Sequence, residues 1–354
     1  MGEPGAPLRQ ERTRPANRSV NRGVVHLTAR VSIVVPVYYN APSLPALWER
    51  LSALADSQSA YAFEFIFVDD GSGDESWGVL NDLAGRDPRI VLVRLARNFG
   101  SGAAILAGMT CATGDCVGFV AADLQDPPET LAEMLVRWQA GDKVVFAARR
   151  DRRGDPLATR LFAGLFHWLF KRLVFPHASP HGIGFFLVDR QVADVVIRCE
   201  ERNAHLIGLI LWTGFKYSMV EYERIPRRHG RSRWTFARKL KYFIDAFVAF
   251  TYLPLRLASA LGLLLSLLGG VYALVVIGVR LSHPTQVAGW SALMVVVLLM
   301  SGIQLVMLGV IGEYLWRNLD AARRRPLFIV DSVVRRPDSL GAEPAGPLRS
   351  RAGS

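Results

Sequence analysis

Two long segments without a charged residue constrain the fold of this chain more than any other feature. Residues 257–279 are 23 consecutive uncharged positions, and residues 287–312 are 26. A helix needs about 20 mainly apolar residues to cross the hydrocarbon core of a bilayer. Helices on the surface of soluble proteins carry a polar face and rarely avoid charge for so long. The sequence therefore predicts two transmembrane helices within residues 255–314.

The charges that flank these segments predict how they are oriented. Arg256 precedes the first segment and four arginines follow the second, whereas the connector 281–286 contains no lysine or arginine. Positively charged flanks remain on the cytoplasmic side of a membrane. We therefore expect a multi-pass protein of the inner (cytoplasmic) membrane. The globular part and both termini would lie in the cytoplasm.

A basic amphipathic stretch precedes the first predicted span. Eight lysines and arginines and no acidic residue lie between positions 224 and 241. Phe236, Leu240, Phe243 and Phe247 repeat at helical spacing and would form one apolar stripe. We interpret residues 226–254 as a basic loop followed by a helix that lies in the interface of an anionic bilayer. An amphipathic helix packed on the globular domain is the alternative.

Composition narrows the classes of protein and partner. Hydrophobic residues make up 51% of the chain and charged residues only 21%, which excludes a disordered chain. The net charge of +11 favours an acidic partner. Because the basic residues cluster beside the predicted spans, anionic lipid explains them better than nucleic acid does. Residues 1–30 and 315–354 are interpreted as basic tails, the first disordered and the second cytoplasmic. Gly262, Gly269 and Gly270 would allow close helix packing, which is compatible with a homo-oligomer.

Residues 31–225 carry the alternating pattern of an α/β domain. Apolar runs typical of buried strands occupy 31–37, 63–69, 90–95, 116–121 and 144–148. Helical patterns over 43–57, 74–86, 101–113 and 129–140 separate them. Continuous apolar strands between helices predict a mostly parallel sheet that is covered on both faces.

Polar residues follow each predicted strand, where an open α/β sheet binds its ligands. The segments are 36–40, 69–73, 97–100, 123–128 and 149–150, and they contain acids, amides and arginines. A nucleoside diphosphate bound through Mg²⁺ or Mn²⁺ requires this mixture, because oxygens hold the metal and arginines neutralise phosphate. No GxGxxG follows the first strand and no GxxxxGK[ST] occurs. A dinucleotide oxidoreductase and a P-loop NTPase are therefore disfavoured.

With these motifs in order, the chain resembles the inverting glycosyltransferases of family 2, which have a GT-A fold. More narrowly, residues 31–325 resemble polyprenyl-phosphate glycosyltransferases, a group that includes dolichyl-phosphate mannose synthase and bacterial undecaprenyl-phosphate sugar transferases with two C-terminal membrane helices. The motifs are VPVYYN (35–40), VDDGS (68–72), RNFG (97–100), AG (107–108), ATGD (112–115), ADLQDPPE (122–129), GFFLVDR (184–190), HGRSRW (229–234) and PLR (254–256).

The resemblance implies a role for individual residues. Residues implied to hold the nucleoside and its sugar are Pro36, Tyr38, Val68, Asp70 and Ala122, with Asp70 accepting hydrogen bonds from the base. Residues implied to hold the metal and diphosphate are Asp123 and Gln125. Phosphate-binding arginines would be Arg149 and Arg160, the second of them for the acceptor. Arg227 and Arg233 would belong to a loop that closes over the nucleotide. Asp123, Arg149 and Arg160 are the implied catalytic residues.

Three positions depart from the family pattern. The metal motif usually reads Asp-Ala-Asp, but here the first carboxylate is replaced by Ala121. Asn40 stands where a glutamate is common, and Gly164 where a serine is common. These departures bear on metal affinity and on the identity of the sugar more than on the fold.

The implied reaction moves a sugar from a UDP- or GDP-linked donor to a polyprenyl phosphate, expected to be undecaprenyl phosphate, at the cytoplasmic face. One alternative is a processive polysaccharide synthase. Such enzymes carry QxxRW and more spans, whereas SRW at 232–234 lacks the glutamine. The other alternative, prompted by Ala121, is a catalytically degenerate homologue that serves as a membrane scaffold or regulatory subunit.

Overall fold

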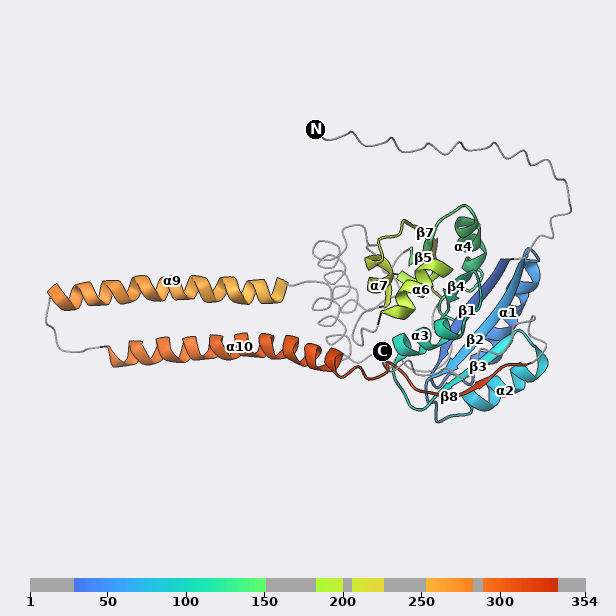
Figure 1. Ribbon diagram of the computed structural model, residues 1–354, viewed down its shortest axis with the longest axis horizontal. Coiled ribbons are helices and arrows are strands. Elements are labelled where there is room, and N and C mark those ends of the chain that lie inside the picture. Colours follow the sequence, from blue (N-terminus) through green and yellow to red (C-terminus); the bar gives the residue numbers. More distant parts are fainter. Residues whose placement is uncertain (1–28, 151–182, 200–205, 226–252, 283–288, 337–354) are drawn as a thin grey trace, which may run out of the picture.

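The computed structural model describes residues 29–150, 183–199, 206–225, 253–282 and 289–336 (Figure 1). Several sequence predictions fall outside these residues. They are the N-terminal tail up to position 28, the basic loop and interfacial helix over 226–252, and the site residues Arg160, Arg227 and Arg233.

One mixed sheet organises the described part of the globular domain. Its eight strands lie in the order β7-β5-β6-β4-β1-β2-β3-β8. The strands are β1 (Ala29–Val37), β2 (Tyr61–Asp69), β3 (Ile90–Leu95), β4 (Cys116–Phe119), β5 (Val144–Arg149), β6 (Ile183–Asp189), β7 (Tyr217–Tyr222) and β8 (Val330–Val334). Four neighbouring pairs are parallel, and β6 and β8 pair antiparallel with their neighbours. The prediction of a mostly parallel sheet is confirmed.

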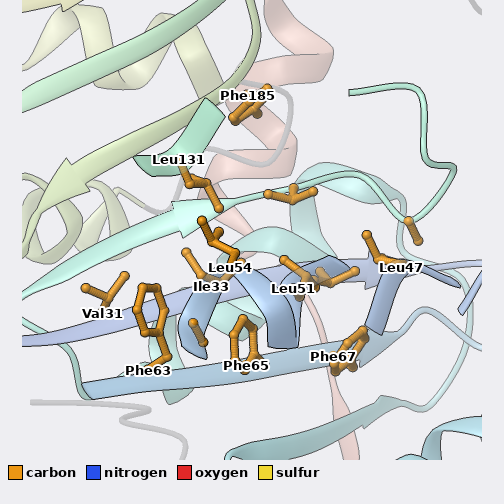
Figure 2. Close-up of a cluster of buried hydrophobic side chains, with 14 of the residues drawn as sticks. Val31, Ile33, Leu47, Leu51, Leu54, Phe63, Phe65, Phe67, Leu131 and Phe185 are labelled. Carbon is orange, nitrogen blue, oxygen red and sulfur yellow. The ribbon is translucent and has the colours of Figure 1, made fainter. Parts of the chain in front are cut away.

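Helices cover both faces of this sheet because its inner strands alternate between two apolar cores. On β1, Val31, Ile33 and Val35 face one core, while Val34 faces the other. The first core is covered by α1 (Leu44–Ser57), α2 (Ser76–Arg86) and α4 (Thr130–Gln139). The second is covered by α3 (Ser101–Cys111), α6 (Arg190–Arg198) and α7 (Leu206–Trp212). Figure 2 shows the first core, where Phe63, Phe65 and Phe67 of β2 lie beneath the leucines of α1.

Strand β8 was not expected from the sequence. It lies in the segment interpreted as a basic tail and pairs antiparallel with β3, so it covers an edge that would otherwise be open. The N–H of Ala96 donates to the carbonyl of Ile329 (2.9 Å). Beyond the strand, the Arg335 guanidinium donates to the Cys111 carbonyl (3.1 Å) and lies 3.8 Å from the buried Glu64 carboxylate. The segment after the helical hairpin is therefore part of the domain.

Two long helices form a hairpin that projects away from the domain (Figure 1). They are α9 (Leu253–Ser282) and α10 (Trp290–Ala322). Among the described residues, one stretch is long and apolar enough to cross a membrane. It is Leu255–Tyr272, with a mean hydropathy of 1.6 and no residue buried inside the protein. The second predicted span is not identified by the same test.

The chain leaves and re-enters the sheet at one edge. Strand β7 is parallel to β5. Both β5 and β4 are antiparallel to β6, and β4 is parallel to β1. Strand β7 therefore ends at the carboxyl edge of the parallel strands. Strand β8 begins at this edge too, because Val330 pairs with Leu95 at the end of β3. The hairpin is thus inserted in the sequence between the two outermost strands, one of which ends and the other begins at the carboxyl edge.

Truncation before Val330 removes β8 and the Arg335 contacts, so it should destabilise the domain and expose β3. We expect the thermal midpoint in detergent to fall by about 5–10 °C, since loss of about 1 kcal/mol shifts a domain of this size by about 2–4 °C. Truncation after Arg336 keeps β8 and serves as the matched control. Equal midpoints for both truncations would show that β8 contributes nothing to stability.

Candidate active site

The loop after β1 places two tyrosines at the carboxyl edge of the sheet. The N–H of Tyr38 donates to the Asn40 side-chain oxygen (3.0 Å), and the N–H of Tyr39 donates to the Ser72 hydroxyl (3.1 Å). Tyr39 has a φ of +57°, a left-handed conformation that is uncommon outside glycine. The two rings meet edge to face at 4.8 Å, and Tyr39 is 42% exposed. This arrangement offers aromatic surface to a flat ligand such as a nucleobase.

Three of the predicted nucleoside-binding residues belong to the scaffold beneath the edge. Pro36 pairs with Val68 in the parallel register of β1 and β2. The Val68 side chain is fully buried in the second core, and Ala122 is buried as well. The Ala122 carbonyl accepts a hydrogen bond from the Ser43 hydroxyl (2.7 Å). Because its side chain is buried, Val68 can contact a ligand only through its main chain.

Asp70 joins the loops that follow β2 and β3. One carboxylate oxygen accepts the N–H of Phe99 (2.7 Å), and the other accepts the N–H of Gly100 (2.9 Å). Burial raises the pKa of this carboxyl, although the two N–H donors oppose the shift. Gly71 allows the close approach of the loops, because a Cβ there would lie 2.7 Å from the Arg97 carbonyl carbon. Asp70 positions the RNFG loop, and the remaining lone pairs of its oxygens are the acceptors left for a base.

The motif after β4 begins with a tight turn. The Asp123 carboxylate accepts the N–H of Gln125 (3.2 Å), and Leu124 between them has a left-handed φ of +59°. Non-glycine residues in this conformation are energetically costly and gather at functional sites. The turn brings two of the predicted diphosphate-binding residues together.

The segment after β7 crosses this motif. The Ile225 N–H donates to the Gln125 main-chain carbonyl (2.9 Å). The Arg224 guanidinium donates to the Gln125 side-chain oxygen (2.6 Å). A cationic side chain thus binds the oxygen that the resemblance assigned to a metal.

A buried acid anchors the same segment from below. The Asp126 carboxylate accepts the Tyr222 hydroxyl (2.6 Å) and is almost fully buried. Burial and the adjacent Asp126 raise the pKa of Tyr222, while Arg149 opposes the shift. Arg149 itself has a buried Nε that finds no hydrogen-bond acceptor among the described residues. We call Gln125, Asp126, Arg149, Tyr222 and Arg224 the strand-end cluster.

The donor set fits a metal ion only in part. The described ranges contain no group of three His, Cys, Asp or Glu residues that could hold one. Mg²⁺ is often bound by one or two carboxylates together with substrate phosphates. Asp123 fits such an ion, whereas Gln125 fits it poorly, because the Arg224 guanidinium on its oxygen repels a second cation.

Sequence reasoning found most of this edge but missed three residues of the cluster. It gave no role to Asp126, Tyr222 or Arg224. A signal was available for the last two, because they lie at and just after a strand, as the predicted site residues do. The predicted strands lie within residues 31–148, so the sequence pattern indicated no strand end at Tyr222.

Comparison with known proteins identifies the family. The domain described as Glycosyl transferase family 2 matches residues 32–194. The uncharacterized glycosyltransferase YkcC of Bacillus subtilis (strain 168) is 40% identical over 299 residues, which are 84% of this chain and 92% of the relative. The prophage bactoprenol glucosyl transferase homolog of Escherichia coli (strain K12) is 31% identical over 304 residues, which are 86% of this chain and 99% of the relative. The bactoprenol glucosyl transferase of Shigella phage SfV is 31% identical over 85% of this chain and 98% of the relative.

The family match lies within the α/β domain, and the three relatives align with 84–86% of this chain. With the α/β domain and its polar carboxyl edge, they establish that the chain belongs to glycosyltransferase family 2 and is a glycosyltransferase.

Proposed function

We propose that the protein moves a sugar from a UDP- or GDP-linked donor to a polyprenyl phosphate, with inversion at the anomeric carbon. Undecaprenyl phosphate is the expected acceptor, and the cytoplasmic face of the inner membrane the expected location. Two relatives that align over nearly their whole length carry bactoprenol glucosyl transferase in their names. Bactoprenol is a polyprenol, so the names support this class of acceptor.

The geometry of the hairpin insertion is the observation that carries the proposal. The strand that precedes the hairpin ends, and the strand that follows it begins, at the carboxyl edge of the sheet, where the strand-end cluster is found. A hairpin that enters a bilayer would therefore draw this edge toward the membrane surface. A phosphate at headgroup depth could then reach the cluster while its polyprenyl chain stays in lipid.

The exposed apolar side chains of both helices support a membrane location. Leu263 and Leu274 of α9 are 74% and 70% exposed, and Leu305 of α10 is 69% exposed. Apolar surface of this extent is costly in water, and in lipid it is not. We propose that α10 spans the bilayer together with α9. Arg280 lies beside the connector, but one arginine there is outweighed by Arg256 and the four that follow the second span.

The chemistry of the acceptor explains why no strong base is needed. A phosphate monoester is already an anion at neutral pH and can attack the anomeric carbon directly. Arg149, with its buried unpaired Nε, and Arg160 would hold that phosphate in line with the departing nucleoside diphosphate. Attack from the face opposite the leaving group inverts the anomeric centre.

A divalent cation would stabilise charge on the leaving diphosphate. Asp123 is the carboxylate proposed to hold Mg²⁺ or Mn²⁺ together with the donor phosphates. Tyr38 and Asp70 would bind the nucleoside, and Arg227 and Arg233 would close over it.

A donor screen tests the proposal. Full-length protein in detergent, with undecaprenyl phosphate and Mg²⁺ or Mn²⁺, should release a nucleoside diphosphate from at least one UDP- or GDP-sugar. Release should require the lipid, because the acceptor phosphate is the nucleophile. Release without lipid would point to another acceptor. No release with any donor from folded protein would favour the scaffold alternative.

Replacing Asp123 by Ala should reduce turnover about 100-fold or more, because it removes the carboxylate proposed to act on the diphosphate. Asp82, an exposed acid on α2, provides the control, and Asp82→Ala should leave turnover unchanged. Initial rates at saturating donor measure both. Near wild-type turnover of Asp123→Ala would remove this residue from the mechanism.

The proposed topology predicts which sites an impermeant thiol reagent can reach. In a background without the native cysteines, Gln286→Cys in the connector should be labelled on intact cells. Asp331→Cys in β8 should be labelled only after lysis. Labelling of both only after lysis would contradict the two-span hairpin.

A further inference from the structure

The contacts of Arg224 use only part of its capacity to donate hydrogen bonds. Its guanidinium donates to the Gln125 side-chain oxygen (2.6 Å), and its Nε lies 3.8 Å from the Asp126 carboxylate. The acceptor oxygen of Asp126 already holds the Tyr222 hydroxyl at 2.6 Å. In the described part of the chain, the buried Nε of Arg224 makes no hydrogen bond. The side chain is therefore held in place, and not all of its N–H groups are used in hydrogen bonds to the described residues.

The charges around Asp123 and Gln125 suggest which ligand the remaining N–H groups of Arg224 could bind. The usual Asp-Ala-Asp pattern would place two carboxylates at this turn, and their negative charge favours a divalent cation. Here Ala121 leaves Asp123 as the only carboxylate of the Asp-Ala-Asp pattern. The remaining nearby acid, Asp126, is buried beneath Tyr222. The Arg224 guanidinium therefore places one permanent positive charge beside Gln125, in the turn that begins at Asp123, without any metal.

We propose that Arg224 is a donor-binding residue whose guanidinium contacts the diphosphate and makes nucleotide binding largely independent of metal. The inference rests on the proposed function, because the ligand is the nucleoside diphosphate of that reaction. Gln125 and Asp126 orient the guanidinium, and the Arg224 side chain is 30% exposed. A guanidinium is always charged and presents paired donors that match phosphate oxygens.

The same contact changes the role of Gln125. Its oxygen orients Arg224, and the positive charge of that guanidinium disfavours a metal cation at the same oxygen. A metal in this protein would depend on Asp123 and on the phosphates, which predicts weak binding in the absence of nucleotide.

Nucleotide affinity without metal is the first test. Calorimetry with full-length protein in detergent and EDTA should show binding of UDP or GDP. Arg224→Ala should raise the dissociation constant of the nucleotide about 10-fold or more, consistent with the loss of a charge-assisted hydrogen bond. Arg224→Lys keeps the positive charge but loses the paired N–H donors of the guanidinium, so its nucleotide affinity should lie between those of wild type and Arg224→Ala. The matched control is Arg137→Ala, because Arg137 is an exposed arginine of α4 that pairs with Glu133.

Mn²⁺ affinity is the second readout and does not depend on turnover. Loss of the free Mn²⁺ signal in electron paramagnetic resonance should show weak binding to the wild-type protein. The double variant Ala121→Asp, Arg224→Gln restores a carboxylate and removes the guanidinium from Gln125. It should bind Mn²⁺ about 10-fold more tightly.

The outcomes separate this inference from the proposed function. Binding of UDP or GDP in EDTA that is equal in wild type and Arg224→Ala would overturn the role of Arg224 and leave the transferase proposal intact. So would wild-type binding that requires metal. Failure of wild type to bind either nucleotide with or without metal would refute the nucleotide site itself. A lower thermal midpoint for Arg224→Ala with unchanged nucleotide affinity would show that the residue is structural.

Discussion

The shared direction of the parallel strands is the constraint on which the rest of this structure depends. Because β1, β2, β3, β4, β5 and β7 run the same way, their carboxyl ends meet at one edge of the sheet. The loops that carry polar residues therefore lie side by side although they are far apart in the sequence. The same constraint brings the end of β7 and the start of β8 to this edge, so the helical hairpin is attached beside the site.

Buried carboxylates hold these loops together. Asp70 accepts two main-chain N–H groups from the loop after β3, and Asp126 accepts the hydroxyl of Tyr222 from β7. A buried polar group without a partner is costly, so each acid specifies the loop that satisfies it. In both cases an acid of one strand end fixes the main chain or side chain of another. The site is thus organised by acids that are themselves largely withdrawn from solvent.

The sequence predicted the parts of the fold that follow from local pattern. Apolar runs such as 31–37 and 90–95 became β1 and β3 because strands buried on both faces must be continuously apolar. Strand β8 was missed because VDSVV is short and lies among arginines, and only its pairing with β3 makes it a strand. Val68 was assigned to the nucleoside by resemblance, but the strand period places its side chain in the core. The Gln125–Arg224 bond joins residues 99 positions apart, and nothing local indicates it.

The topology and the charge of the site are connected through one segment. Arg224 belongs to the stretch that leaves β7 toward α9, so the residue that contacts Gln125 lies between the sheet and the helical hairpin in the sequence. Displacement of this stretch relative to the sheet would move the guanidinium away from the turn of Asp123 and Gln125. At the opposite end of the strand order, β8 and Arg335 hold the segment that follows α10 against the sheet. A glycosyltransferase must bring its donor and its acceptor together at one anomeric carbon, so restraint of both paths helps to keep this edge of the sheet in a fixed geometry.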